Sequence, residues 1–268
     1  MLTTRSQRWR DRRARFVDDL TVIDPRDFAV DQLDPQPARR FVAAHHYLPN
    51  YPAAQIAVGL FGKQAALVGV AVFAMPSTAS VITRHTGFSE PSRGTTLARF
   101  FLLPDVAGNG ETWFLARALR ELRRERPQIE AVVSCSDPQA GHIGQCYAAS
   151  SGAFRGMTKP RTAYRIAGIP IAGRTLSKIR LGERGAAGAI DQLVSLSAPR
   201  PDMTEEPDIW LARLRRNRIL VADRTLGLFT YCFELTRAAR RQGRTLPRKP
   251  YPKQLPAAHP RFPFMAAA

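Results

Sequence analysis

The residues best suited to chemistry lie in the stretch 130–156. There a short apolar run of β-type residues ends in a polar group, after which Gly141 and His142 open a helical pattern that includes Tyr147. The polar group consists of Ser134, Cys135, Ser136 and Asp137. Strands of α/β folds often deliver such side chains to a site at their carboxyl ends. Each also has a structural interpretation, with Asp137 as a helix cap and His142 as a surface residue.

Two further groups offer imidazole, phenol and guanidinium side chains. His46 and Tyr47 end a predicted helix that begins at Pro35, where a ligand could reach them, although a histidine there could instead be packed in the core. Arg99 interrupts the apolar run of a predicted strand, 95–103. An arginine in that position either faces solvent or is held for a carboxylate or phosphate.

A glycine-containing turn, 104–110, separates this strand from a predicted helix, 111–126. Backbone N–H groups at a helix start favour anions, so the turn is a candidate cradle for a pyrophosphate. A single Gly-x-Gly is equally typical of a simple turn.

The charge of the chain indicates a polyanionic partner. Forty Lys and Arg stand against 22 Asp and Glu, a net charge of +18, and six arginines fall between Arg5 and Arg15. Nucleic acid is the first expected partner and an anionic membrane the second. The alternative is that the positive charge reflects an arginine-biased composition and no particular partner. Between Arg213 and Lys249 basic residues alternate with aromatic ones, which suits nucleic acid better than a solvated basic face.

The remaining composition favours a cytoplasmic protein. The three cysteines form no CxxC pair and are expected to be reduced. No apolar run reaches membrane-spanning length, and the first residues lack the apolar segment of a signal peptide, so no membrane association is expected.

The pattern of elements predicts an α/β (α+β) fold with a mixed sheet and helices on both faces. The expected elements include an antiparallel hairpin of strands 56–61 and 65–73. A long loop, 75–94, is expected to follow this hairpin. The other expected strands are 28–30, 95–103, 131–133 and 162–167, and the other expected helix is 35–47. The predicted domains are a basic N-terminal arm 1–24, a folded domain 25–180, a linker 181–209 and a basic C-terminal extension 210–268.

Four segments in this order resemble the phage Mom family of DNA-modification proteins, within the GNAT acyltransferase superfamily. They are HHYLP at 45–49, LARFFLLPDVAGNGET at 97–112, SCSDPQAGHIGQCYAASSGAFRG at 134–156 and LPRKPYPK at 246–253. The third is the most specific. The chain departs from the family pattern at Leu97, where an acidic residue is usual, and at 150–152.

The resemblance implies a GNAT-like, mostly antiparallel mixed sheet and a transferase that converts adenine in double-stranded DNA to an N6-carbamoylmethyl-type adenine. Such modification protects phage DNA from restriction and takes place in the host cytoplasm. The implied reaction centre is His46, Tyr47, Arg99 and Asp137, with Ser134 and Tyr147 nearby. The implied acyl-CoA site is Leu103, Gly108, Asn109, Gly110, Glu111 and Thr112.

Alternatives remain at both the site and the protein level. His46, Tyr47 and Asp137 could bind iron instead of moving protons, because they offer N and O donors. The protein could also be a non-catalytic DNA-binding protein on the same fold, or an acyltransferase for a small molecule or protein. The sequence does not decide the oligomeric state, for which a dimer is one option.

Overall fold

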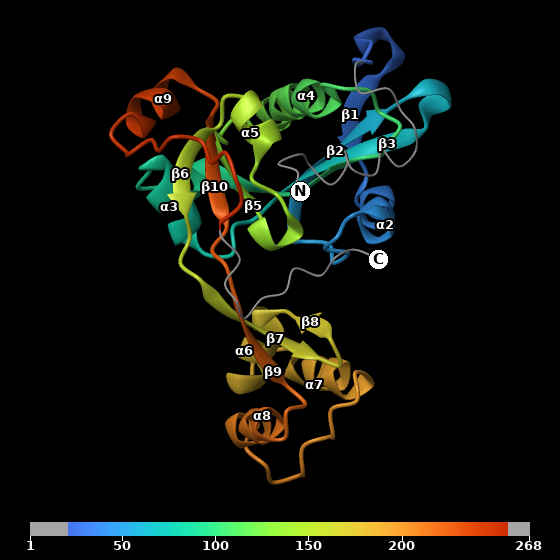
Figure 1. Cartoon of the computed structure of the whole chain (residues 1–268), viewed down its shortest axis with the longest axis vertical. Helices are drawn as coiled ribbons and strands as arrows, with labels where there is room; N and C mark the ends of the chain where they lie inside the picture. Colours follow the sequence, from blue (N-terminus) through green and yellow to red (C-terminus); the bar gives the residue numbers. More distant parts are fainter. Residues whose placement is uncertain (1–20, 257–268) are drawn as a thin grey trace. The chain divides into compact units, whose positions relative to one another are not determined.

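The computed structural model describes residues 21–256, which form two compact units (Figure 1). The first contains the chain up to Thr158 together with the chain from Leu228 onward, and the second is the segment Lys159–Gly227. Residues 1–20 of the predicted basic arm and residues 257–268 of the predicted extension lie outside the described residues.

The first unit is organised around a seven-stranded sheet in the order β1-β2-β3-β4-β5-β10-β6. Its strands are β1 Ala29–Leu33, β2 Ala54–Phe61, β3 Leu67–Ala74, β4 Gly94–Leu102, β5 Ala131–Ser136, β10 Phe229–Glu234 and β6 Ala153–Met157. Only β4 and β5 pair in parallel; the other neighbours are antiparallel. The predicted mixed, mostly antiparallel sheet is therefore confirmed, as is the hairpin of β2 and β3.

Helices cover both faces of this sheet. They are α2 Pro35–His45, α3 Ala79–Thr86, α4 Gly110–Glu125, α5 Gln145–Ala149 and α9 Arg237–Gly243, with short 3-10 turns η1 Pro25–Asp27, η2 Lys63–Ala65, η3 Pro91–Arg93 and η4 Pro138–Ala140. Successive strand residues point to opposite faces, so Val58 packs in the core under α4 whereas Ala57 packs under α2. This two-sided burial explains why β2 and β3 are nearly continuous apolar runs.

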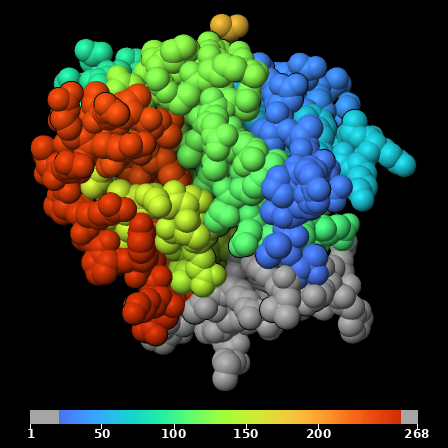
Figure 2. All heavy atoms as spheres, turned by 90° about the horizontal axis from the view of Figure 1, so that it is seen from above, coloured from blue at the N-terminus to red at the C-terminus, as the bar shows by residue number. Residues whose placement is uncertain are grey.

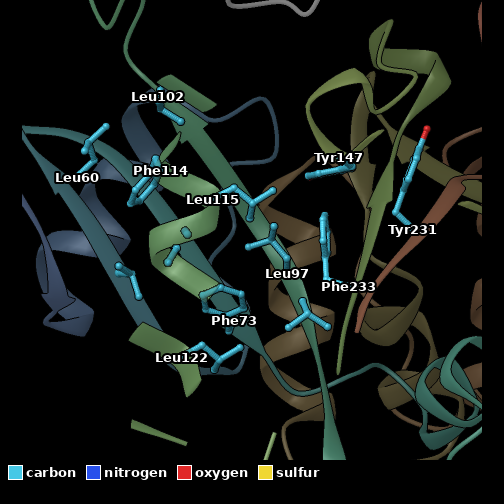
Figure 3. Close-up of a cluster of buried hydrophobic side chains, with 14 of the residues drawn as sticks. Leu60, Phe73, Leu97, Leu102, Phe114, Leu115, Leu122, Tyr147, Tyr231 and Phe233 are labelled. Carbon is cyan, nitrogen blue, oxygen red and sulfur yellow. The ribbon is translucent and has the colours of Figure 1, made fainter. Parts of the chain in front are cut away.

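The largest core lies between the sheet and α4 (Figure 3). Phe114, Leu115, Ala118 and Leu122 recur at helical spacing and are fully buried. Glu111 in the first turn and arginines in the last turn suit the helix dipole. This helix begins at the open end of β4, so it also positions residues of the site.

Two local expectations are corrected. The stretch 75–94, predicted to be a loop, contains α3, whose Ile82 and Thr86 are buried. The helical segment predicted from Gly141 is confined to α5, which starts only at Gln145. Gly141 and Gly144 both have positive φ, of 78° and 79°, and such left-handed residues cannot continue a right-handed helix.

The second unit has its own sheet and core. Strands β7 Arg161–Ile166, β8 Ile169–Ile171 and β9 Val221–Thr225 form a sheet in the order β8-β7-β9, and the helices are α6 Gly173–Arg180, α7 Ala186–Ser195 and α8 Pro207–Arg216. Trp210 is fully buried, and its indole N–H donates to the carbonyl of Pro199 at 2.9 Å.

These two units differ from the predicted domain boundaries. The predicted linker 181–209 contains α7, because Ala189 and Leu193 lie on one helical face and join the core around Trp210. The predicted extension is divided, because β10 inserts between β5 and β6 of the first unit. Across residues 21–256 the structure contains no helix of the length and apolar character that a bilayer crossing requires.

Candidate active site

The parallel pair at the middle of the sheet opens toward its carboxyl end. β4 and β5 are paired only from Gly94 with Ala131 to Leu97 with Ser134, whereas β4 continues to Leu102. The register of β4 against β3 also shifts at this point, between Val72 and Phe73, as at a β-bulge. A cavity of about 130 Å³ lies in this opening. Its lining comes from β4, β5, α4, α5 and the ends of two loops: His46, Tyr47, Leu97, Ala98, Phe100, Phe101, Leu102, Glu111, Cys135, Ser136 and residues 141–147.

His46 faces this cavity from the residue after α2. Its backbone N–H donates to the carbonyl of Val42 at 3.0 Å, and its Nδ1 accepts the N–H of Leu48 at 2.9 Å. Burial, with smaller contributions from the charges of Arg99 and His142, lowers the pKa of His46 to about 4. The ring is therefore neutral near pH 7, and since Nδ1 is an acceptor, the proton is on Nε2.

Arg99 holds the loop that follows His46. Its Nε donates to the carbonyl of Leu48 at 3.2 Å, and its Nη2 donates to the carbonyl and side-chain oxygens of Asn50, each at 2.7 Å. Burial lowers its pKa below the ordinary value. The sequence left open whether this guanidinium faces solvent or is held for an anion; in the structure it positions the segment that carries His46 and Tyr47.

Aromatic rings gather at the cavity around Tyr47. The rings of His46 and Tyr47 stack with centroids 4.6 Å apart, and the ring of His142 meets Tyr47 edge-on at 5.4 Å. All three residues line the cavity. Two imidazoles and a phenol thus come together from the segment after α2 and from the loop after β5, which are distant in sequence.

Asp137 shapes the loop that carries His142. One carboxylate oxygen accepts the N–H of Gln139 at 2.9 Å, which caps η4, and the Asp137 carbonyl accepts the N–H of His142 at 3.0 Å. Asp137 is not among the residues that line the cavity. The capping interpretation of Asp137 therefore matches its geometry.

Gly144 and Tyr231 fix the other end of this loop. The Tyr231 hydroxyl donates to the carbonyl of Ile143, and a Cβ at Gly144 would collide with the Tyr231 ring. Tyr147 is buried beside them, and burial raises its pKa above that of a free phenol, so it stays protonated. Tyr231 comes from β10, and its role was not anticipated from the sequence.

The serines of β5 lie on the α4 side of the strand. Ser134 and Ser136 are 1% and 5% exposed, and within the described residues the Ser136 hydroxyl has no hydrogen-bond partner. Ser136 lines the cavity whereas Ser134 does not. A buried hydroxyl without a partner is costly, so Ser136 offers an unused polar contact to whatever fills the cavity.

The turn before α4 does not match the expected acyl-CoA cradle in full. The N–H of Gly108 donates to the carbonyl of Thr21 at 2.8 Å, and the N–H of Gly110 donates to Ala107 at 3.2 Å. A Cβ at Gly110 would meet Val106, so this glycine serves packing. Among the other predicted cofactor residues, Leu103 donates its N–H to the carbonyl of Val68 at 2.7 Å. Asn109 is the N-cap of α4 in a left-handed conformation, and its carbonyl accepts the Thr112 hydroxyl. Glu111 lines the cavity. Two N–H groups expected to bind pyrophosphate are thus engaged within the protein.

The proposed iron ligands are not assembled as a set either. Nδ1 of His46 and one carboxylate oxygen of Asp137 already accept backbone N–H groups. Among residues 21–256 no cluster of three His, Cys, Asp or Glu side chains has metal-binding geometry. His46, Tyr47 and Asp137 therefore do not fit an iron centre in this arrangement.

Of the residues predicted for the site, the structure brings His46, Tyr47, Glu111 and Tyr147 together at the cavity. Cys135, Ser136 and His142, which the sequence analysis named as candidates but did not place in the reaction centre, also line the cavity, and so does Cys146. Two features of the sequence could have indicated these residues: the alternation of side chains between the two faces of β5, and the Gly-His pair at 141–142. The loop after β5 is too long for the sequence to predict the position of His142.

Comparison with solved structures finds distant acetyltransferase matches. One is a spermidine/spermine N-acetyltransferase from Vibrio cholerae, at 8% identity and TM-score 0.41, covering 81% of this chain and 97% of that one. Another is a putative acetyltransferase from Salmonella typhimurium with acetyl-CoA, at 8% identity and TM-score 0.41, covering 79% and 95%. No curated protein matches the chain in sequence.

The model of the Mom protein family matches residues 27–253. This range includes all four segments on which the resemblance was recognised, the whole cavity and the complete second unit. The chain therefore belongs to the Mom protein family.

Proposed function

We propose that this protein is a GNAT-like transferase that modifies the exocyclic amine of adenine in double-stranded DNA, producing an N6-carbamoylmethyl-type base that shields phage DNA from restriction in the host cytoplasm. The observation that carries the proposal is the cavity between β4 and β5, where His46, Tyr47 and His142 meet. Family membership supports DNA as the substrate.

The lining of the cavity suits a flat base taken out of a duplex. Phe100, Phe101 and Tyr47 provide aromatic surface, and Ser136 and His46 provide polar groups at its edge. Enzymes that act on a base within DNA must expose it, and they hold the exposed base by stacking and hydrogen bonds. The cavity offers both kinds of contact.

Proton removal from the amine is assigned to His142. The amine nitrogen forms a bond to the electrophilic carbon of an activated donor, loses one proton, and the donor's leaving group departs with its electron pair. His46 cannot take that proton, because its only lone pair accepts the N–H of Leu48. Tyr147 stays protonated, and Asp137 is used as a cap. His142 lies at the cavity beside Tyr47 and has the residue type for acid–base work.

His46 has a complementary role as a donor. A neutral imidazole with its proton on Nε2 can donate a hydrogen bond to negative charge that develops on the donor group or its leaving group. Its low pKa keeps it in this form at neutral pH. The donor is an activated carbon electrophile; the N–H groups of Gly108 and Gly110 are engaged within the protein.

Nucleoside mass spectrometry tests the proposal. DNA from cells that express the full chain, in a host that supplies the donor, is digested and compared with DNA from cells that express His142→Asn. We expect a mass-shifted deoxyadenosine only with the wild-type chain. Unmodified deoxyadenosine from wild-type cells would overturn the transferase and favour a non-catalytic DNA-binding protein.

A further inference from the structure

The helix α9 presents one face made entirely of arginine. Arg237, Arg240 and Arg241 of the helix and its C-cap residue Arg244, which keeps helical backbone angles, follow the spacing i, i+3, i+4, i+7, which places them on the same side. All four are exposed, and together they surround a surface hollow of about 380 Å³. The same spacing filled with apolar residues would be a core face, so this face is unusual in carrying only cations.

This arrangement is unfavourable for the isolated helix. Like charges three and four residues apart repel, and Arg237 lies at the helix start, where the dipole disfavours a cation. None of the ion pairs within residues 21–256 involves any of the four arginines. A bound polyanion would neutralise the repulsion that the protein itself leaves in place.

Buried contacts hold α9 in position despite this repulsion. Thr236 caps the helix by accepting the N–H of Ala239 at 3.0 Å. Arg155, with a side chain 4% exposed, pairs with Glu234 at 2.6 Å and donates to the carbonyl of Gly243 at 3.2 Å. A Cβ at Gly243 would collide with the Glu234 carboxylate, so the helix packs directly on this pair. The arginine face is therefore presented on a fixed support.

A second hollow extends the basic surface toward α4. It measures about 660 Å³ and shares Arg240 with the first. Its other basic residues are Arg120 and Arg123 of α4 and Arg248. Its one carboxylate, Glu234, is already paired with Arg155. Ser150 also lines it, with a buried hydroxyl that has no partner among the described residues. Figure 2 shows the red segment that holds α9 beside the green of α4 on this face. We call these seven arginines, 120, 123, 237, 240, 241, 244 and 248, the basic face.

We propose that the basic face binds the phosphates of duplex DNA next to the base that enters the cavity, a partner that follows from the proposed function. Helix α4 connects the two places, because Glu111 lines the cavity and Arg120 lines the basic face. Nine residues of helix span about 14 Å, which corresponds to about four base pairs along B-DNA. The basic face thus lies within reach of the same duplex.

Its chemistry favours DNA over a membrane. The cations are all arginine, whose planar fork binds phosphate oxygens in pairs. None of the large apolar side chains that are exposed in the described chain lies on α9, so the helix has nothing to insert into lipid.

The test compares two double variants with the same charge change in the full chain. Arg240→Gln/Arg241→Gln neutralises the basic face, and Arg40→Gln/Arg126→Gln neutralises two exposed arginines outside it. Binding to a fluorescent 20-base-pair duplex is measured across a salt series. Loss of two phosphate contacts lowers the salt slope by about 1.8 and weakens binding at 0.15 M salt about 30-fold. We expect this for the first pair and less than a threefold change for the control.

Equal effects of the two pairs, or no effect of the first, would overturn the basic face. The proposal would also be overturned if Arg240→Gln/Arg241→Gln weakened binding to phosphatidylserine vesicles but left duplex binding unchanged. Mass spectrometry of wild-type DNA separates the two proposals. If wild-type cells contain modified DNA but Arg240→Gln/Arg241→Gln binds the duplex as tightly as wild type, only the proposal on the basic face fails. If wild-type cells contain unmodified DNA but this variant binds the duplex more weakly, only the proposed transferase activity fails.

Discussion

Replacing His46 by Asn and by Gln separates its two nitrogens. The Asn side-chain oxygen can take the place of Nδ1 and accept the N–H of Leu48, whereas the Gln amide can take the place of Nε2 and donate into the cavity. His46→Asn should therefore keep the hydrogen bond with the N–H of Leu48 and lose the hydrogen-bond donor at the cavity. His46→Gln should lose the loop contact, at a cost of about 1 kcal/mol.

The pH dependence of stability follows from the lowered pKa of His46. Above pH 6.5 the ring is neutral in both folded and unfolded chains, so it adds no pH dependence. Below 6.5 the unfolded chain binds a proton that the folded chain refuses until about pH 4. Stability at this residue therefore falls as pH falls, by about 2 kcal/mol between pH 7 and 5. His46→Asn removes this loss, so its pH profile should be flatter by that amount.

Two measurements check this reasoning. Long-range proton–nitrogen correlation spectra of the imidazoles report the tautomer and the titration directly, and urea unfolding at pH 7 and 5 reports stability. We expect an Nε2-protonated ring that titrates near pH 4, and loss of modified deoxyadenosine in a folded His46→Asn protein. A His46 ring that titrates near 6.5, or equal pH slopes for wild type and His46→Asn, would refute the buried neutral imidazole. Full activity of His46→Asn would refute its role as a donor.

Substitutions at three positions test the loop after β5. Asp137→Asn should keep both stability and modification, since asparagine also caps a helix. Asp137→Ala should lower the free energy of unfolding in urea by about 0.5–2 kcal/mol. Loss of modification in a stable Asp137→Asn protein would show that Asp137 takes part in the reaction. His142→Asn should abolish modification without changing the melting temperature by more than a few degrees, and activity in that variant would exclude it as the base. Gly144→Ala should cost about 1–3 kcal/mol from its positive φ alone, with more from the contact with Tyr231, and a neutral effect in thermal unfolding would contradict the close approach.

The local patterns of the sequence were sufficient for the strands β1 to β5 and for the main helix, but not for β6 and β10. Continuous apolar runs predicted the β2–β3 hairpin, because these strands are buried on both faces. The apolar stripe of Trp113, Leu115, Leu119 and Leu122 predicted α4, because the helix is buried on one side. The strand β10 was interpreted as part of a basic extension, since its six residues are surrounded by arginines and its partners β5 and β6 lie more than seventy residues earlier in the chain. Pairing at that distance leaves no local signal.

The site was predicted by residue type more reliably than by role. Imidazole and phenol groups were recognised at His46 and Tyr47, and both reach the cavity. What could not be foreseen is which partner each group takes. Arg99 binds carbonyls of the loop at 48–50, and Asp137 binds an N–H two residues ahead. Such bonds depend on the path of the backbone, which the side-chain pattern does not encode.

The position of β10 leads to a prediction about the second unit. The chain leaves the first unit after Thr158 and returns at Leu228, and these two residues are hydrogen-bonded to each other. The N–H of Thr158 donates to the carbonyl of Leu228 at 2.9 Å, and the N–H of Leu228 donates to the hydroxyl of Thr158 at 2.9 Å. They therefore occupy the closing position of a hairpin between the antiparallel strands β6 and β10.

Removing residues 159–227 and joining Thr158 to Leu228 by Asn-Gly should leave the first unit folded, because a two-residue turn suits such a hairpin. A chain that ends at residue 180, the predicted boundary of the transferase domain, should fail to fold, because it lacks β10 and leaves β5 and β6 without a common neighbour. It also lacks Tyr231, which holds Ile143 and Gly144 beside the cavity. Circular dichroism and proton spectra of the two proteins decide the matter. A folded 1–180 chain would show that the sheet does not depend on β10, and an unfolded Asn-Gly chain would show that the first unit needs residues 159–227.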